Sequence, residues 1–397
     1  MIKGALDGIK VIEVCQVMAG PFCGCLLADM GADVVKVENP DGGDTARTMG
    51  RYFDGGEGHG FMNLNRNKRS IVINLKDKSG IEILKKLIEK SDVFVENLRP
   101  GTVHKMGLGY DNLKTINPSI IYASISGYGK TGPFCEKGGF DLVSQGLSSL
   151  MSFTGEPGGE PSKIPVPICD LNAGMYTAFS ILSAYIYKQK TGCGQFIDTS
   201  LTDSGLGYTF WAASQFFPTG EIPIPRGSAH EMTAPYQALK CKDGYLVLGA
   251  ANQKSWERLC KAINKEEYLT HPDYAENSSR TEKYKQLAKD LELEFVKKNR
   301  DEWIKILDKA KVPCGPILNM QETFSHPQIQ AREMCVEIEH PKAGSTKVLG
   351  FPPKLSLTPG VIRRPSPVLG EHTDEILAEY GISKEVILDL RENSVIN

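Results

Sequence analysis

The sequence predicts an α/β protein, with a large domain around a mainly parallel sheet and a smaller α+β domain inserted into it. Three observations lead to this prediction. Short runs rich in Val and Ile alternate with helical periodicity through the first 200 residues, which is typical of strand–helix–strand units. Two Pro- and Gly-rich stretches, 217–235 and 351–373, interrupt the alternation. The chain has 397 residues, which is enough for two or three domains.

The expected elements follow in order along the chain. Apolar, β-branched runs predict the strands, and apolar residues spaced by three and four predict the helices. The strands are expected at 9–14, 32–39, 70–75, 92–98 and 119–126, and helices at 20–31, 79–91, 171–187 and 373–381. Ligands of such sheets bind outside the carboxyl ends of the strands. The loops after residues 14, 39, 97 and 126 are therefore candidate walls of a site.

The second half of the chain has a different character. Lys242-Asp243-Gly244 has the composition of a tight turn and predicts a hairpin, and charged helical segments follow from 253 to 310. We therefore expect three segments: a large α/β domain over 1–224, a small domain over 225–325, and a return to the large domain over 326–397.

Composition argues against several classes of function. The net charge is −2, so no basic surface points to nucleic acid or to an anionic membrane. The ten cysteines show no paired CxxC spacing and the seven histidines no HExxH motif, so we expect no metal site. The N-terminus lacks the long apolar stretch of a signal peptide. Together with reduced cysteines, this predicts a cytoplasmic protein.

Gly127, Gly129 and Gly132 spell G-x-G-x-x-G after an expected strand. A dinucleotide site also needs the third glycine to open a helix, but Pro133 follows at once and leads into another loop. A turn-rich loop is the favoured interpretation, and nucleotide binding is the weaker one. The nucleophile elbow of hydrolases, G-x-S-x-G, does not occur in the sequence.

Asp170 stands at the head of the apolar run 171–187. The plain interpretation is a helix N-cap, a position that aspartate favours. The alternative is catalysis, because the extended, apolar "KIPVPIC" before it would place the carboxylate at a buried strand–helix junction. The helix N-terminus would favour its ionised form. Gly174, one turn later, leaves room for a ligand or another backbone to approach. On these residues alone both interpretations stay open.

Six stretches together resemble the class III CoA-transferases, the family of formyl-CoA and carnitine CoA-transferases. They are "LDGIKVIEVCQVMAGPFCGCLLADMGADVVKVENPDGGD", "NLNRNKRSIVINLK", "DVFVENLRPGTVHKMGLGYDNL", "YASISGYGKTGP", "DLNAGMYTAFSILSAYIYKQKTGCGQFIDTSL" and "PSPVLGEHTDEIL". The likeness extends from residue 6 to the terminal helix. It implies a Rossmann-like large domain, a small domain and an interlocked homodimer. It also implies a CoA thioester and a small carboxylic acid as substrates, with no tightly bound cofactor.

The resemblance implies nucleophilic catalysis by Asp170. Its carboxylate would attack an acyl-CoA, and CoA would pass through an anhydride and an aspartyl-CoA thioester to a free acid. Asp141 falls where formyl-CoA transferase has a Glu near the reacting acyl group, so it is the second candidate catalytic residue. The CoA contacts that the family implies, carried over by position, are Val17, Met18, Ala19, Asn39, Leu75, Lys76, Asn97, Leu98, Arg99 and Lys105.

Three departures from relatives narrow the expected function. Asn39 replaces an Arg of formyl-CoA transferase, so an adenine or phosphate contact of that enzyme is expected to be absent. "LGAANQKSW" (248–256) replaces that enzyme's run of glycines, which argues against oxalate/formate specificity. The α-methylacyl-CoA racemases of the family carry a His where this chain has Phe140, and Phe140 cannot take a proton. We therefore expect CoA transfer from an acyl-CoA to a carboxylic acid. A racemase or epimerase, and a CoA-binding protein without catalysis, are the alternatives. The acceptor stays open among 2-hydroxy, carnitine-like and aryl acids.

Overall fold

The computed structural model describes residues 4–50 and 56–397. Its contacts divide the chain into two compact units, which are described one at a time. The large unit contains the residues up to 150, 163–220 and 327–397, and the small unit contains 151–162 and 221–326. The domain limits expected from the sequence, as boundaries of independently folding parts, stay a prediction.

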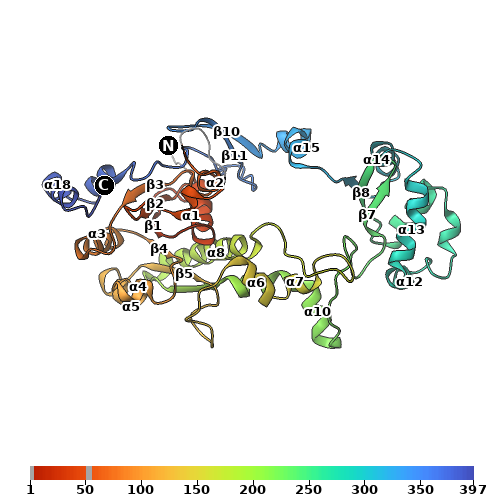
Figure 1. The fold of residues 1–397 in the computed structure, drawn as a ribbon, viewed down its shortest axis with the longest axis horizontal. Helices are drawn as coiled ribbons and strands as arrows, with labels where there is room; N and C mark the ends of the chain where they lie inside the picture. Colours follow the sequence, from red (N-terminus) through yellow and green to blue (C-terminus); the bar gives the residue numbers. More distant parts are fainter. Residues whose placement is uncertain (1–3, 51–55) are drawn as a thin grey trace. The chain divides into compact units, whose positions relative to one another are not determined.

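A six-stranded parallel sheet forms the centre of the large unit (Figure 1). Its strands are β1 (Lys10–Val14), β2 (Asp33–Glu38), β3 (Arg69–Val72), β4 (Val93–Glu96), β5 (Ile121–Ser126) and β6 (Phe196–Ser200). The order is β3-β2-β1-β4-β5-β6, and every neighbouring pair is parallel. The direction of winding reverses between β1 and β4, as in a Rossmann-like domain. The expected α/β class is confirmed, and β6 is a strand that the sequence did not predict.

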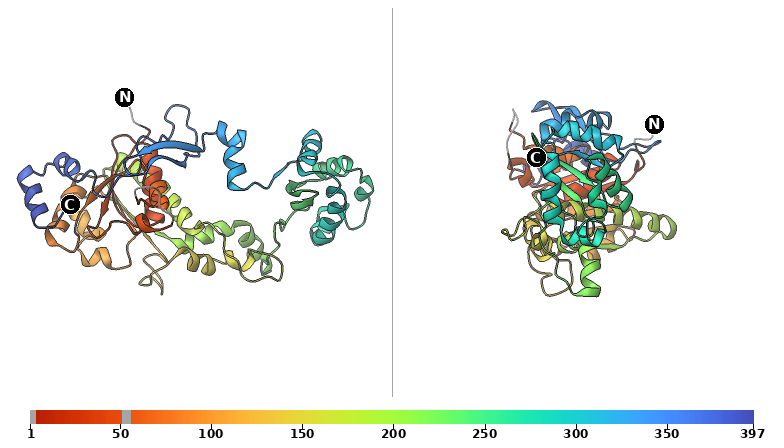
Figure 2. Two further views of the ribbon diagram at one scale, coloured as in Figure 1. Left: turned by 45° about the horizontal axis from the view of Figure 1, so that its top comes forward. Right: turned by 90° about the vertical axis from the view of Figure 1, so that its right-hand side faces the viewer.

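Helices cover both faces of this sheet, and Figure 2 shows them from two further directions. The helices are α1 (Ala19–Asp29), α3 (Lys78–Glu89), α5 (Tyr110–Ile116), α8 (Ile168–Thr191), α17 (Thr373–Glu379) and α18 (Lys384–Glu392). On one face, strand residues such as Ile12 and Val35 share a buried apolar core with α3, α5, α17 and α18. On the other face, α1 packs on the central strands, while α8 packs on β5, β6 and α1. Burial on both faces explains why the strands are continuous Val- and Ile-rich runs.

The other elements outside the small unit connect these layers or extend from them. They are η1 (Thr45–Thr48), α2 (His59–Asn65), α4 (Thr102–Lys105), α6 (Asp141–Leu147), α9 (Leu201–Leu206), η2 (Gly207–Thr209), α10 (Phe210–Thr219), α16 (Pro327–Ala331), β10 (Cys335–His340), β11 (Gly344–Leu349) and, where the chain passes from one unit to the other, α7 (Leu150–Phe153). β10 and β11 form an antiparallel hairpin. Within the described ranges, no helix is long and apolar enough to cross a bilayer.

The glycine-rich sequence after β5 forms a loop, and the next helix, α6, begins only at Asp141. An added Cβ on Gly127 would stand 2.6 Å from Gly139 Cα, so two parts of the loop touch backbone to backbone. Gly129 and Gly132 have φ angles of +82° and +84°, which glycine adopts at no steric cost. These glycines therefore shape a loop, in agreement with the turn-rich loop that the sequence favoured.

The small unit is built around a three-stranded antiparallel sheet with helices on one face. Its elements are β7 (Tyr236–Cys241), β8 (Gly244–Gly249), α11 (Gln253–Ala262), η3 (Glu266–Leu269), α12 (Asn277–Glu282), α13 (Tyr284–Phe295), α14 (Arg300–Lys309), β9 (Cys314–Pro316) and α15 (Met320–Ser325). Leu246, Trp256 and Leu291 lie in its buried core. Cys241 pairs with Gly244 across a two-residue turn, which confirms the predicted hairpin.

A fully buried group of charges lies between the large sheet and α1. Glu13 of β1 accepts from Lys36 Nζ at 3.1 Å and from Lys68 Nζ at 2.8 Å, and all three side chains are 0% exposed. Lys68 also donates to the carbonyl of Pro21 at 2.8 Å. These partners offset the cost of removing the charges from water. An added Cβ on Gly24 of α1 would overlap Glu13 Oε2, so α1 can cross the charges only with a glycine at this position.

We predict that Gly24→Ala destabilises the protein. Alanine favours a helix over glycine by about 1 kcal/mol, but its methyl group would push the Glu13 carboxylate away from the two lysines. We expect a net loss of about 2–4 kcal/mol in the free energy of unfolding, measured by urea denaturation. The matched control is Gly60→Ala in α2, where an added Cβ meets no atom within 4 Å. Equal stability of the two variants would contradict the prediction.

Candidate active site

The loops after β1 and β4 meet where the strand order reverses, and the side chain of Asn97 joins them. The Gln16 N–H donates to Asn97 Oδ1 at 2.8 Å, and Asn97 Nδ2 donates to the Gln16 carbonyl at 2.9 Å. One amide therefore holds the backbone of the neighbouring loop through both of its hydrogen-bonding groups. Asn97 is one of the expected CoA contacts, and its first role in this structure is to brace the β1–α1 loop.

The β1–α1 loop makes a strained turn at Val17, whose φ is +63°. A β-branched residue rarely adopts this left-handed conformation. The Val17 N–H donates to Asp44 Oδ1 at 3.0 Å, and Asp44 forms an ion pair with Lys36 at 2.9 Å. Met18 and Ala19 follow as the N-cap and first residue of α1, and the Met18 side chain makes no capping hydrogen bond. Strain that buried charges hold in place is often found at functional loops.

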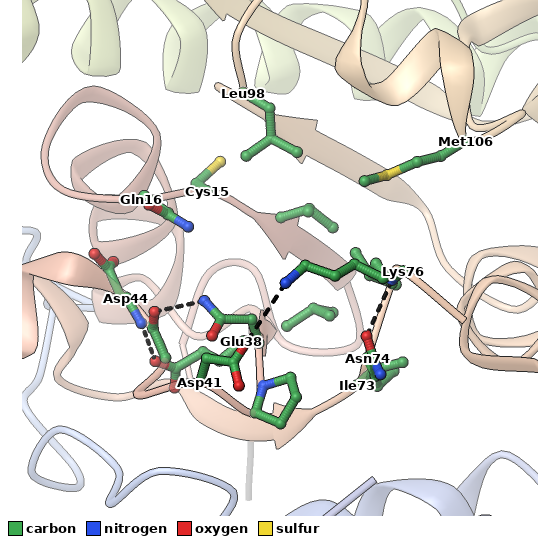
Figure 3. A pocket seen from close by; sticks show the side chains of 16 residues that line it. Cys15, Gln16, Glu38, Asp41, Asp44, Ile73, Asn74, Lys76, Leu98 and Met106 are labelled. Atoms are coloured by element: carbon green, nitrogen blue, oxygen red, sulfur yellow. Dashed lines mark hydrogen bonds and ion pairs between the residues drawn. The ribbon is translucent and has the colours of Figure 1, made fainter. Parts of the chain in front are cut away.

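A cavity of about 160 Å³ opens at the carboxyl ends of β1 to β4 (Figure 3). Its lining combines apolar side chains with amides and carboxylates. The expected CoA contacts that line it are Asn39, Leu75, Lys76 and Leu98. Lining residues that sequence reasoning missed include Gln16, Asp41, Asn74 and Met106. The expected contacts that lie outside the lining are Val17, Met18, Ala19, Asn97, Arg99 and Lys105. The volume suits a planar ring system and is too small for a molecule as long as CoA.

The three cations expected to face the phosphates of CoA have different surroundings. Lys76 extends toward Asp41, with Nζ 3.4 Å from Oδ2 and both side chains largely exposed (Figure 3). Arg99 and Lys105 are exposed and have no acidic partner in the described part of the chain. An exposed ion pair such as that of Lys76 contributes little free energy, so all three cations are available to an anionic ligand.

Asp170 is the third residue of α8, which begins at Ile168 after the N-cap residue Pro167. The N-cap assignment made from the sequence is therefore wrong. The physical reason is that another helix supplies the cap: Asp141, the first residue of α6, accepts the Cys169 N–H through Oδ1 at 2.8 Å. With that N–H satisfied from outside, the helix can begin before Asp170, and the Asp170 carboxylate is left for another use.

The segment that leads into α8 also differs from expectation. Residues 163–167 form no strand, because Pro165 and Pro167 lack the N–H groups that a ladder needs. Val166 is 48% exposed, so the predicted buried strand–helix junction is wrong. The segment is irregular, with a bend at 165–166, and the backbone of Ile164 is bonded by Gln145 of α6.

The Asp170 carboxylate is partly buried and has no hydrogen-bond or ion-pair partner within residues 4–50 and 56–397. Burial raises its pKa, and the negative charge of Asp141 raises it further, to about 7 against an ordinary value of 3.8. The first turn of a helix favours an anion, but here that effect does not cancel the loss of hydration. A strongly perturbed carboxylate of this kind is characteristic of functional sites.

Gly174, one turn after Asp170, holds α8 against α1. An added Cβ at Gly174 would stand 2.6 Å from the Ala19 carbonyl oxygen and 3.2 Å from Cys23 N. Of the two neighbours that the sequence left open, a ligand or another backbone, the structure shows the backbone of α1. The contact places the first turns of α8 beside the start of α1, and so next to the loop that contributes Gln16 to the cavity.

The large unit has a doubly wound α/β fold, and its candidate site groups are a strand-end cavity, exposed cations and a carboxylate of raised pKa. Comparison with known proteins gives the family. The chain matches the model of CoA-transferase family III over residues 6–373, and it belongs to that family. The resemblance inferred from the sequence is thereby confirmed. The protein is a CoA-transferase that uses CoA thioesters as substrates.

Individual relatives resemble the chain over almost its whole length. It is 40% identical to succinyl-CoA:glutarate CoA-transferase of Homo sapiens, over 94% of this chain and 85% of that protein. It is 37% identical to succinate–glutarate CoA-transferase of Agrobacterium fabrum, over 95% of this chain and 96% of the other. A CAIB/BAIF family protein from Brucella suis has a solved structure that matches with a TM-score of 0.85 and 37% identity, covering 95% of this chain and 100% of that one.

We predict that Asp170→Asn stabilises the folded protein at alkaline pH. The carboxyl has a pKa of about 7 when folded against 3.8 ordinarily, so its ionised form is disfavoured by folding. This penalty is absent below about pH 4, grows as the pH rises to about 7, and then stays constant at no more than about 4 kcal/mol. The variant should therefore gain stability over the wild type in urea denaturation at pH 8 and lose that gain toward pH 4.

The matched control for this measurement is Asp111→Asn, which replaces an exposed aspartate in the first turn of α5. Because water hydrates that carboxylate in the folded protein, we expect a change of less than about 0.5 kcal/mol at either pH. A wild type as stable as Asp170→Asn at pH 8 would show that the raised pKa is wrong.

Proposed function

We propose that Asp170 is the nucleophile of an acyl-CoA:carboxylate CoA-transfer reaction. The observation that supports this most directly is the isolated carboxylate in the first turn of α8, next to the loop that lines the strand-end cavity. A carboxylate without a cation or hydrogen-bond donor is not stabilising the fold. Its oxygen atoms are free to attack an electrophile, and a carboxylate is a known class of covalent catalyst.

The proposed reaction balances in four steps and needs no external base. An Asp170 oxygen attacks the thioester carbonyl, the C–S bond breaks, and CoA thiolate leaves a mixed anhydride behind. The thiolate attacks the Asp170 carbonyl carbon, which gives an aspartyl-CoA thioester and releases the first acid as its carboxylate. The acceptor carboxylate attacks that thioester and expels CoA thiolate, forming a second anhydride. The thiolate then attacks the acyl carbonyl of the acceptor, which yields the new acyl-CoA and regenerates Asp170.

The electrostatics of the site suit this sequence of steps. A carboxylate with a pKa of about 7 is more basic, and so a better nucleophile, than an ordinary aspartate, yet half of it is ionised at neutral pH. Asp141 supports the reaction in this proposal by capping α8 and by keeping the pKa of Asp170 high. The N–H groups at the start of α1 are proposed to stabilise the oxyanions that form on the acyl carbon.

CoA is proposed to bind along the carboxyl ends of β1 to β4. Its planar base fits the cavity lined by Asn39, Leu75, Lys76 and Leu98, and its phosphates are proposed to meet Lys76 and the exposed Arg99 and Lys105. The remaining proposed contacts are Val17 and Met18 of the β1–α1 loop, Ala19 at the start of α1, and Asn97 of the loop after β4. They would guide the thioester arm toward Asp170.

A short dicarboxylic acid is the proposed acyl group and acceptor. The two curated relatives described above act, by their names, on succinyl-CoA or succinate together with glutarate. We propose that this chain also acts on short dicarboxylic acids. Which acid gives up CoA and which acid accepts it would depend on their concentrations. Phe140, 74% exposed and directly before Asp141, supplies no proton-transfer group, so nothing in the site favours the racemase alternative.

A second copy of the chain is proposed to cover the outer side of α8. Large apolar side chains stand exposed along this helix: Met175, Tyr176, Phe179, Ile186 and Tyr187. Phe179 alone is 68% exposed. Soluble monomers rarely leave such a continuous apolar face in water. We propose a homodimer in the cytoplasm. The second subunit would also remove water from the neighbourhood of Asp170 and so protect the anhydride from hydrolysis.

The nucleophile can be trapped chemically. Succinyl-CoA and hydroxylamine are added to the wild type, and the modified peptide is identified by mass spectrometry. We expect a hydroxamate on Asp170, because hydroxylamine cleaves both the anhydride and the aspartyl thioester. Asp170→Ala should lower the rate of CoA exchange between succinyl-CoA and glutarate by at least about 10⁴-fold, while its Kd for CoA changes less than threefold. Retained exchange in Asp170→Ala, or a label elsewhere, would refute the proposal.

Dimer formation is tested by placing a charge on the exposed face of α8. Phe179→Asp should shift the protein from twice the chain mass of 43.6 kDa to a monomer in light scattering, because a buried unpaired carboxylate is costly. The control is Leu293→Asp on α13, which carries an equally exposed apolar side chain, 66% against 68%, and should leave the mass unchanged. A dimeric Phe179→Asp would contradict this assignment of the interface.

A further inference from the structure

Gln145 is a fully buried polar side chain whose amide is completely engaged. Its Nε2 donates to Asp141 Oδ2 at 2.7 Å and to the Ile164 carbonyl at 3.2 Å, and its Oε1 accepts the Ile164 N–H at 2.9 Å. A longer contact of 3.4 Å reaches the Val166 carbonyl. One side chain of α6 therefore bonds both Asp141 of the same helix and the segment that leads into α8.

Asp141 connects Gln145 to the first turn of α8. One of its oxygens accepts from Gln145, and the other accepts the Cys169 N–H at 2.8 Å. Because the carboxylate is held at both oxygens, it can rotate only if one of the two hydrogen bonds breaks. The residue after Cys169 is Asp170, so the orientation of the Asp141 carboxylate and the start of α8 are mechanically joined.

We propose that Gln145 is the positioning residue of the active site: it holds Asp141 against the first turn of α8 and so sets the geometry of Asp170. This inference rests on the proposed nucleophilic role of Asp170. Gln145 touches no reacting atom. It acts through Asp141, and an amide is required because one end must donate to a carboxylate while the other accepts a backbone N–H.

The charged and titratable groups around Asp170 allow the role of Gln145 to be tested through the pH dependence of the reaction. From α6, Asp141 is the charged group that acts on it. From α8 itself, Cys169 precedes it and is in turn affected by the charges of Asp141 and Asp170, while Tyr208 of η2 is affected by Tyr176 and Cys169. Burial raises the pKa of both the Cys169 thiol and the Tyr208 hydroxyl, so both are uncharged at neutral pH. A new ionisable group at position 145 would therefore report on Asp170 through Asp141.

The test compares the pH dependence of kcat for CoA exchange in the wild type, Gln145→Glu and Gln145→Leu. The wild type should lose activity on the acid side with a midpoint near the Asp170 pKa of about 7. In Gln145→Glu, one proton shared between the new carboxyl and Asp141 keeps the hydrogen bond at low pH. Loss of this proton at higher pH leaves two carboxylates that repel each other. We expect a bell-shaped profile, with kcat at about pH 9 at least tenfold below its maximum.

Gln145→Leu removes the hydrogen bonds at every pH, so we expect kcat to fall by at least about thirtyfold across the range while KM for acyl-CoA changes less than threefold. The matched control is Gln286→Glu, since Gln286 bonds an aspartate four residues away, Asp290, at 2.8 Å on the exposed surface of α13. That variant should keep the wild-type profile. Melting temperatures of all variants accompany the kinetics.

The possible outcomes distinguish a failure of the proposed CoA-transfer function from a failure of the proposed role of Gln145. A wild type that exchanges no CoA overturns the proposed function itself. A wild type that exchanges CoA, together with folded Gln145 variants that keep its kcat and its single acid limb, overturns only the role of Gln145. If Gln145→Leu does not fold, the isosteric Gln145→Glu decides, because its protonated form restores the donor. A new alkaline limb in that variant alone supports the inference.

Discussion

The buried charges of Glu13, Lys36 and Lys68 are the constraint on which the structure around the candidate site depends. Burial alone would lower the pKa of Lys36, but the charges of Glu13 and Asp44 outweigh that effect and raise it. The ammonium therefore stays charged where water cannot reach it. Removing Glu13 would leave Lys68 as a buried charge without an ion-pair partner among the residues that the structure describes, a defect that costs several kcal/mol.

The influence of this group extends to the carboxyl ends of the strands, where the cavity opens. Lys36 pairs with Asp44, and Asp44 in turn accepts the N–H of the strained Val17. The chain of contacts runs from the centre of the sheet to the loop that separates the cavity from α8. Strain at that loop persists because a rigid, fully paired interior surrounds it, which is the usual condition for keeping an unfavourable backbone conformation in a native structure.

Most of the sheet was predictable, and the start of α8 was not. Buried parallel strands are continuous apolar runs, so the first five strands stand out in the sequence. β6 does not, because this edge strand is the polar and partly exposed sequence FIDTS. The N-cap assignment of Asp170 followed a sound local preference. It failed because the acceptor for the Cys169 N–H is Asp141, 28 positions away, and no local pattern shows such a partner. The sequence also led us to expect that the helix N-terminus favours ionised Asp170, whereas burial and, second, the charge of the distant Asp141 raise the pKa of Asp170. Gln145 gave one signal, its spacing of four residues from Asp141, but that spacing is common on any helix.

The contact between Gly174 and α1 has a consequence for how such an enzyme changes over evolutionary time. The atoms nearest to Gly174 there are the Ala19 carbonyl oxygen and Cys23 N of the backbone and Cδ1 of the Phe22 side chain. The spacing between the two helices is therefore set at this point mainly by backbone and by the absence of a side chain at Gly174. Side chains around the acyl group can then be exchanged freely to admit a longer, shorter or more polar acid. The Asp170 carboxylate and the β1–α1 loop, for which we propose a contact with CoA, keep their mutual distance throughout, so new substrates can be acquired without a change in the reaction.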